Sequence, residues 1–214
     1  MESARILGQN HIRKHFENAI KMGKISHAYI INGEEGTGKM RLAVEFAKAL
    51  QCVENNPEFY RDNHLQFDFG MEDTKKEITG RACGECRSCK QTDSKNQPDI
   101  KYVTYEKSGI GVDEIREQIN DDIEIKPYSS RYKIYIVDDS EKMTVQAQNA
   151  LLKTIEEPPE YAIIILLTTN ADMFLPTILS RCVLLNIRPV KEETIKNQLM
   201  TEYGINSYQA GVAV

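Results

Sequence analysis

The sequence has no excess of positive charge, and its amino terminus lacks an apolar segment. Lysine and arginine number 27 against 32 aspartate and glutamate residues in a chain of 214, a formal net charge of -5. No overall basic field is available for non-specific nucleic-acid binding, so we expect any DNA contact to be local or to belong to partners. Charges scattered through the first 20 residues exclude a signal peptide or membrane anchor there and predict a cytoplasmic protein without membrane contact.

Strand-like and helix-like segments alternate along the chain. Helical spacing of apolar residues predicts helices at 10–22, after residue 38, and at 112–125, 145–156 and 190–203. Thr144 is expected to cap the fourth of these, which ends before Pro158-Pro159. The pattern predicts an α/β fold with a mostly parallel five-stranded sheet, helices on both faces and ligands at the carboxyl ends of the strands. The five predicted strands are 28–32, 99–105, 133–138, 162–169 and 183–187.

A glycine-rich segment, GEEGTGKM at residues 33–40, lies between a predicted strand and a predicted helix. A P-loop occupies this position because glycines let backbone N–H groups curl around phosphates, while the helix start and a lysine add positive charge. The motif requires Ser or Thr after the lysine as an oxygen ligand for Mg²⁺, and a thioether there is a poor ligand. We therefore interpret the segment as a degenerate nucleotide site in which ATP and Mg²⁺ binding is doubtful, with a plain tight turn as the alternative. Its residues are Gly33, Gly36, Thr37, Gly38, Lys39 and Met40.

Two acids, Asp138 and Asp139, end the third predicted strand in the manner of a Walker B motif. There the first carboxylate orders Mg²⁺ and the second positions water. Active ATPases of this kind usually have Glu second, and Asp139 is one methylene shorter, so its reach to an attacking water is doubtful. Two acids that only cap a turn are the alternative.

Three cysteines, Cys83, Cys86 and Cys89, follow a polar stretch at 53–80 that reads as a surface insertion, and Cys52 is a candidate fourth ligand. Four thiolates suit tetrahedral zinc, which would staple a polar module that has few core residues. We predict a structural zinc site, with an iron–sulfur cluster or free thiols as alternatives. The fifth cysteine, Cys182, is expected to be a small buried hydrophobe.

Four segments together resemble one family, the AAA+ clamp-loader subunits of bacterial DNA polymerase III of the delta-prime and gamma/tau types. The segments are HAY at 27–29, CGECRSC at 83–89, NALLKTIEEPP at 149–159 and LSRC at 179–182. The last two are the most specific, and the resemblance spans residues 5 to 203. It implies an AAA+ P-loop fold and a subunit of a five-membered ring that places a sliding clamp on primed DNA.

The resemblance also implies roles for two residues outside the P-loop and the acid pair. Arg181, in the Ser-Arg-Cys segment, matches an arginine finger that acts in trans on a neighbour's ATP. Thr169 matches the position that senses the γ-phosphate. Without the family match, Arg181 would read as an ordinary surface arginine.

Departures from the family pattern favour the delta-prime type. This chain has Gly-Lys-Met and Asp-Asp where the gamma/tau type resembles Gly-Lys-Thr and Asp-Glu. The spacer between Cys52 and Cys83 is also longer than is usual in relatives. We therefore expect a subunit without ATPase activity of its own, which donates Arg181 within the polymerase holoenzyme. An ATP-hydrolysing gamma/tau-type subunit is the alternative, and an unrelated P-loop enzyme or metal-binding scaffold leaves the last two motifs unexplained.

The expected domain organisation follows from the same resemblance. Residues 1–189 would form the AAA+ core, with a zinc module at about 52–90, and residues 190–214 would begin a small helical lid. The family continues into a collar domain, which this chain lacks, so we expect the chain by itself to be largely monomeric. The implied partners are gamma/tau and delta subunits, the sliding clamp and primed DNA.

Overall fold

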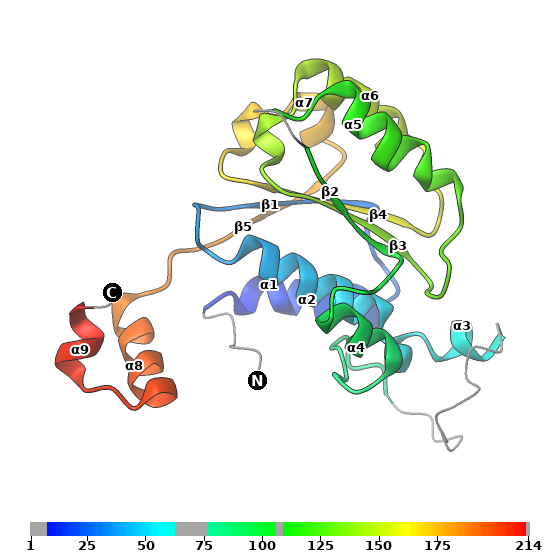
Figure 1. Cartoon of the computed structure of the whole chain (residues 1–214). Coiled ribbons are helices and arrows are strands. Elements are labelled where there is room, and N and C mark those ends of the chain that lie inside the picture. The colour runs from blue at the N-terminus through cyan, green and yellow to red at the C-terminus, as the bar shows by residue number, and fades with distance from the viewer. Residues whose placement is uncertain (1–7, 63–76, 106–108, 213–214) are drawn as a thin grey trace.

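The computed structural model, which describes residues 8–62, 77–105 and 109–212, has a single sheet at its centre (Figure 1). All neighbouring strands are parallel, in the order β2-β3-β4-β1-β5. The predicted five-stranded parallel sheet is therefore confirmed, with strand ends that differ by one or two residues. The strands are β1 (Ala28–Asn32), β2 (Ile100–Val103), β3 (Lys133–Val137), β4 (Ala162–Thr168) and β5 (Val183–Asn186).

The strand β4 is the centre of the sheet because all seven of its residues are buried. Its residues alternate between two apolar clusters: Ile163, Ile165 and Leu167 belong to one face, and Ile164 and Leu166 to the other. A strand covered on both faces reads as a continuous apolar run, which is why its position was evident from the sequence. Burying each such side chain contributes about 1.5–3 kcal/mol.

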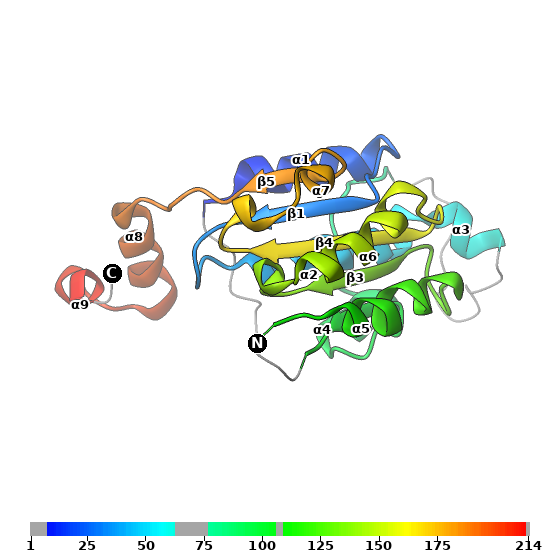
Figure 2. The same cartoon turned by 90° about the horizontal axis from the view of Figure 1, so that it is seen from above.

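Helices cover both faces of the sheet, as Figure 1 and the view from above in Figure 2 show. On one face lie α1 (Asn10–Lys21) and α2 (Lys39–Gln51), where Phe16 stacks on Phe46 with ring centroids 3.9 Å apart. On the other face lie α5 (Val112–Ile115), α6 (Val145–Glu156) and α7 (Pro176–Leu179). The remaining helical segments are η1 (Val53–Asn55), α3 (Pro57–Asp62), α4 (Arg87–Asp93), η4 (Ser140–Lys142), η5 (Ala171–Met173), α8 (Glu192–Tyr203) and α9 (Ser207–Val212).

The prediction of one regular helix at 112–125 is wrong. After α5 the chain forms a π-helical turn, η2 (Arg116–Asn120), and then a 3-10 turn, η3 (Asp122–Glu124). The amide of Asn120 donates to the Ala150 carbonyl at 3.0 Å and accepts from the Thr154 hydroxyl at 2.9 Å. These bonds to α6 compensate for the loss of regular α-helical geometry.

The predicted strand at 99–105 is shorter in the structure, where β2 spans Ile100–Val103 and side-chain bonds flank both of its ends. The Asp99 carboxylate accepts from the backbone N–H groups of Tyr128 and Ser129, at 2.5 and 2.8 Å. Beyond β2, the backbone N–H of Thr104 donates to the Gln118 side chain at 2.9 Å.

Two segments that the sequence analysis set apart from the core are the insertion at 53–80 and the region after residue 189. Part of the predicted polar insertion at 53–80, residues 63–76, lies outside the described residues. At the other margin, α8 and α9 lie apart from the sheet in both views, and α8 has no buried residue. Within the described ranges, no helix is long and apolar enough to cross a membrane.

Parallel pairing places the carboxyl ends of the strands at one edge of the sheet. Gly33 follows β1, Asp138 follows β3 and Thr169 follows β4. Three segments far apart in the sequence therefore meet at the edge where open α/β sheets bind ligands.

The cap of α6 provides a test of the fold at one residue. The Thr144 side chain accepts a hydrogen bond from the Ala147 backbone N–H at 3.1 Å, as the sequence predicts for an N-cap. Thr144→Ala should lower the free energy of unfolding by about 1 kcal/mol, because that N–H loses its partner. Thr144→Ser should retain most of the stability in the same urea titration. Equal stability of the Ala variant and the unmodified chain would contradict the role of the cap.

Candidate functional site

The glycine-rich loop between β1 and α2 has the backbone that a P-loop requires. Gly36 and Gly38 have φ angles of 76° and 86°, in the left-handed region that favours glycine. A Cβ added at Gly33 would lie 2.8 Å from Cβ of Ile187, so the loop also passes too close to the chain after β5 for a side chain. The loop leads directly into the 13-residue helix α2, whose first turn has no side-chain cap.

Lys39 is turned back onto its own loop. Its ammonium donates to the carbonyl oxygens of Gly33 at 2.8 Å and Glu34 at 2.9 Å. The Thr37 hydroxyl donates to the same Glu34 carbonyl at 2.6 Å. A bound phosphate would therefore have to draw Lys39 away from two carbonyl oxygens.

Met40 offers no oxygen where Mg²⁺ would need one. Its side chain is partly buried and packs against the apolar cluster that contains Leu42 and Phe46. The Met40 side chain therefore contributes to the apolar core. A hard cation such as Mg²⁺ lacks here the oxygen ligand that the usual Ser or Thr hydroxyl would supply.

The second acid of the pair is already paired within the chain. Oδ2 of Asp139 accepts from the Tyr105 hydroxyl at 2.7 Å and lies 2.7 Å from the Lys142 ammonium. These hydrogen bonds, that of Lys142 first, lower the pKa of Asp139, which stays ionised. Asp138 is exposed, and its Oδ1 accepts from the Asp139 backbone N–H at 3.0 Å.

Thr169 also has a hydrogen-bond partner within the chain. Its hydroxyl donates to Oε1 of Glu141 at 2.6 Å, while Oε2 of Glu141 is buried without a hydrogen-bond partner among the described residues. Burial acts to raise the pKa of Glu141, but hydrogen bonds, that from Thr169 first, outweigh it and the pKa is lowered.

Tyr105, Glu141 and Lys142 were missed by the sequence analysis. The spacing of Asp139 and Lys142, three residues apart, could have indicated their ion pair. No local signal marks Tyr105, because it lies two residues after β2 and comes near Asp139 only through the parallel pairing of β2 and β3.

Arg181 lies away from this edge of the sheet. Val183 pairs with Tyr29 at the start of β1, so it lies about 13 Å along the strand from Gly33, and Arg181 precedes it. The guanidinium pairs with Glu156, at the end of α6, with 3.0 Å between Nη2 and Oε1, and donates to the Thr177 carbonyl at 3.1 Å. The structure therefore separates Arg181 from the loop, the acid pair and Thr169.

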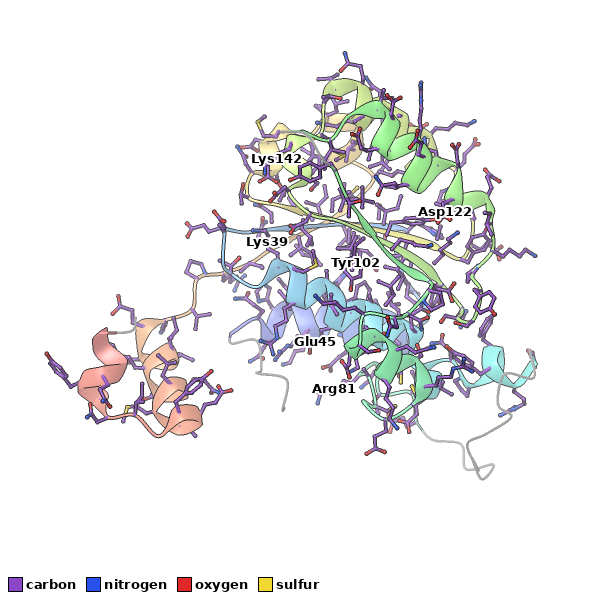
Figure 3. The ribbon with its side chains drawn as sticks, in the orientation of Figure 1. Lys39, Glu45, Arg81, Tyr102, Asp122 and Lys142 are labelled. Atoms are coloured by element: carbon purple, nitrogen blue, oxygen red, sulfur yellow. The ribbon has the colours of Figure 1, made fainter. Side chains whose placement is uncertain are left out.

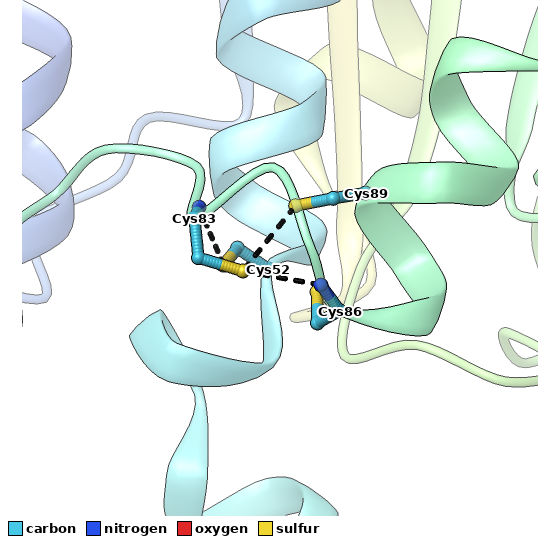
Figure 4. Close-up of side chains that lie close together, drawn as sticks. All are labelled: Cys52, Cys83, Cys86 and Cys89. Carbon is cyan, nitrogen blue, oxygen red and sulfur yellow. Dashed lines mark hydrogen bonds between the residues drawn. The ribbon is translucent and has the colours of Figure 1, made fainter. Parts of the chain in front are cut away.

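The four cysteines come together at the C-terminal end of α2 (Figure 4). The sulfur atoms of Cys52, Cys83, Cys86 and Cys89 all lie within 4.8 Å of one another, and those of Cys83 and Cys89 are 4.0 Å apart. In a tetrahedral zinc site with Zn–S bonds of about 2.3 Å, neighbouring sulfurs are about 3.8 Å apart, so the donor set fits the metal. Three of the thiols are buried and Cys83 is partly buried.

Backbone N–H groups donate hydrogen bonds to two of these sulfurs, an interaction that favours the thiolate form. The Cys83 N–H donates to Sγ of Cys52 at 3.4 Å, and the Cys86 N–H donates to Sγ of Cys83 at 3.3 Å. The pKa of the Cys86 thiol is lowered, chiefly by its hydrogen bond with Cys52. Cys182 lies elsewhere: it is partly buried rather than fully buried, packs against the α5–α6 side of the core, and burial raises its pKa to about 12.

The strand order and the loop after β1 define the class of this protein. A parallel β2-β3-β4-β1-β5 sheet, with a P-loop after β1 and acids after β3, is the P-loop fold of AAA+ proteins. A DNA polymerase III gamma subunit-related protein from Thermotoga maritima shares this fold with a TM-score of 0.58 and 26% identity, over 87% of this chain and 49% of that one.

Sequence comparison specifies the family within this class. The family model described as DNA polymerase III, delta subunit matches residues 8–66 and 65–191. The tau subunit of DNA polymerase III from Bacillus subtilis is 36% identical over 91% of this chain and 30% of its own length. The delta' subunit from the same organism is 29% identical over 91% of this chain and 52% of its own length.

The chain therefore belongs to the DNA polymerase III delta subunit family, as a clamp-loader AAA+ subunit of the gamma/tau/delta-prime type. It spans about half or less of the length of these relatives. Because relatives of both types each match over 91% of the chain, the comparisons support either type.

The cysteine cluster leads to a prediction about metal content. Elemental analysis of the purified chain is expected to find about one zinc per molecule, and Cys89→Ser should lose most of it, because tetrahedral zinc requires all four thiolates. Loss of the metal should also lower the melting temperature. Cys182→Ser is the matched control and should keep its zinc. Iron with visible absorption would instead indicate an iron–sulfur cluster.

Proposed function

We propose that this chain is part of a non-hydrolysing, delta-prime-type subunit of the DNA polymerase III clamp loader. In the cytoplasm it would work with gamma/tau and delta subunits to place the sliding clamp on primed DNA. Arg181 would contribute to catalysis in trans, at the ATP site of a neighbouring subunit. The cysteine cluster would hold a structural zinc with no open coordination position.

The observation that carries this proposal is the placement of Arg181. Its position before β5 and its pair with Glu156 keep the guanidinium away from the P-loop of its own chain. Side-chain exposure of 40% leaves it accessible to another subunit. An arginine so placed can stabilise charge on a transferred phosphoryl group only when that group belongs to a different chain.

The chain's own P-loop supports the non-hydrolysing part of the proposal. Met40 removes an oxygen ligand for Mg²⁺, and the Asp139 carboxylate already accepts from Tyr105 and Lys142. A general base must be free to take a proton from water, and a carboxylate with a lowered pKa is a weak base.

We also propose that residues 1–189 form the AAA+ core and that residues 190–214 begin a helical lid. The placement of α8 and α9 apart from the sheet, with contacts between the two helices, supports this division. With a separate lid, a nucleotide at the edge of the core could change the position of the lid helices relative to the core.

A second candidate is an ATP-hydrolysing subunit of the gamma/tau type. The observation that favours it is the higher identity to the tau subunit, 36% against 29% for delta'. It would require another oxygen ligand in place of the Met40 side chain.

Arg181→Ala in a reconstituted clamp loader tests the trans role. We expect hydrolysis at the one ATP site that receives Arg181 to fall by about 10³-fold or more, as for arginine fingers in well-studied GTPases. Total ATP turnover should lose the share of that site, because the other ATP sites of the ring remain active. Ring assembly, measured by gel filtration, should be unchanged. Glu156→Gln is the matched control: it breaks the same ion pair but keeps the arginine, so turnover should be retained. Equal losses in both variants would assign Arg181 a structural role only.

Lys39→Ala in the same complex separates the two candidate functions. A non-hydrolysing subunit should tolerate this change, with turnover equal to that of the unmodified loader, because its P-loop takes part in no chemistry. A fall as large as that from Arg181→Ala would support the gamma/tau-type alternative.

A further inference from the structure

A groove lies at the edge of the sheet where the strands begin, at the opposite end from the P-loop. It consists of two adjoining hollows, which share Arg131 and Tyr132 in their linings, and the larger has a volume of about 560 Å³. The larger hollow is lined in part by His27, Tyr132 and Tyr161, the residues directly before β1, β3 and β4. We call this feature the amino-edge groove. Ligand sites in proteins have volumes of about 300–1,000 Å³, so the groove is large enough to bind one.

The amino-edge groove is positively charged in a chain that is negatively charged overall. Its lining includes three cations, Lys21, Lys126 and Arg131, and one acid, Glu160. Their formal charges sum to +2, whereas the whole chain carries -5. Within the part of the chain that the structure describes, none of the three cationic side chains has an ion pair or a hydrogen bond. Their charge is therefore available to a partner.

One wall of the groove, at residues 122–131, is held in place by hydrogen bonds to the interior. The ammonium of Lys133 donates to the carbonyl oxygen of Asp122 at 2.5 Å and lies 2.8 Å from its Oδ2. Near the other end of the wall, two backbone N–H groups donate to the carboxylate of Asp99. Figure 3 shows Asp122 at one end of the sheet and Lys39, in the P-loop, at the other. A wall that is already ordered loses little conformational freedom when a partner binds.

Arg131 is the residue of the groove best suited to bind a carboxylate. Its guanidinium lies over the ring of Tyr132, 5.2 Å from the centroid, and its planar fork of donors matches a carboxylate in bidentate geometry. The same contact covers the ring of Tyr132, which is only 8% exposed, so a nucleic-acid base has no free face to stack on there. The geometry therefore favours a peptide carboxylate over the backbone of a single strand.

The smaller hollow provides an apolar site beside Arg131. Its volume is about 220 Å³, enough for one large apolar side chain. The aliphatic side chains in its lining are Ile20, Ile25, Leu50 and Ile78. Protein interfaces commonly depend on one such anchor in a pocket, surrounded by polar contacts. An apolar hollow next to unpaired cations thus complements a segment that combines an apolar residue with acids.

We propose that the amino-edge groove binds an acidic peptide segment of a partner protein. An apolar side chain of that segment enters the smaller hollow, and its carboxylates meet Arg131 and Lys126. Because the groove and the P-loop lie at opposite ends of the sheet, the partner does not compete with a nucleotide. The inference goes beyond the proposed function and does not depend on it.

Selection from a random-peptide display library on the immobilised chain tests this inference. We expect the selected peptides to be enriched in Asp and Glu beside an aromatic or aliphatic residue. A labelled peptide with the consensus sequence, measured by fluorescence anisotropy, should bind Arg131→Gln about tenfold or more weakly, because a charge-assisted hydrogen bond to its carboxylate is lost. Failure to select any acidic peptide whose binding depends on Arg131 would overturn the inference.

Two further variants and a competitor make the result specific. Arg131→Lys keeps the charge but loses the bidentate geometry, so its affinity should lie between those of the unmodified chain and Arg131→Gln. Arg116→Gln removes an exposed arginine from η2, outside the groove, and is the matched control with unchanged affinity. Oligothymidylate should not displace the labelled peptide, and displacement would assign the groove to nucleic acid instead. Circular dichroism would confirm that each variant is folded.

Discussion

Burial of β4 between β1 and β3 is the interaction on which the rest of this structure depends. All seven of its residues are buried, and its two sets of alternating side chains pack against the helix layers on opposite faces. Because every neighbouring pair is parallel, all the strands end at one edge of the sheet. The same packing therefore fixes where the P-loop, the acid pair and Thr169 meet, and it puts Arg181 before the start of an edge strand.

At the edge where the strands end, groups that could contact a nucleotide already have partners within the chain. Lys39 donates to loop carbonyls, Asp139 accepts from Tyr105 and Lys142, and Thr169 donates to Glu141. Each of these hydrogen bonds must break before the group can bind a ligand. The free energy of binding is therefore smaller than the number of polar groups suggests. Catalysis loses more than binding, because it depends on a free acceptor and on a metal held in fixed geometry.

The helix α2 connects the two parts of the molecule that carry chemistry. It begins at Lys39, directly after the P-loop, and ends at Gln51, next to Cys52 of the cysteine cluster. Thirteen residues of helix span about 20 Å. Its buried residues, among them Leu42, Phe46 and Leu50, fix the helix on the sheet, so the cysteine module and the loop keep a constant separation.

Features that depend on neighbours in the sequence were predictable, and features that depend on neighbours in space were not. The strands, the cap at Thr144, the glycine-rich loop and the cysteine spacing are local patterns, since period, turn chemistry and ligand spacing are set within a few residues. The irregular segment after α5 is accompanied by bonds of Asn120 to α6, whereas the sequence pattern there is simply helical. By itself, the sequence determined the fold class, the family and the missing oxygen at Met40. Only the tertiary structure decided that Tyr105 donates to Asp139 and that Arg181 pairs with Glu156, because side chains from separate strands and helices become neighbours only when the sheet and its helix layers assemble.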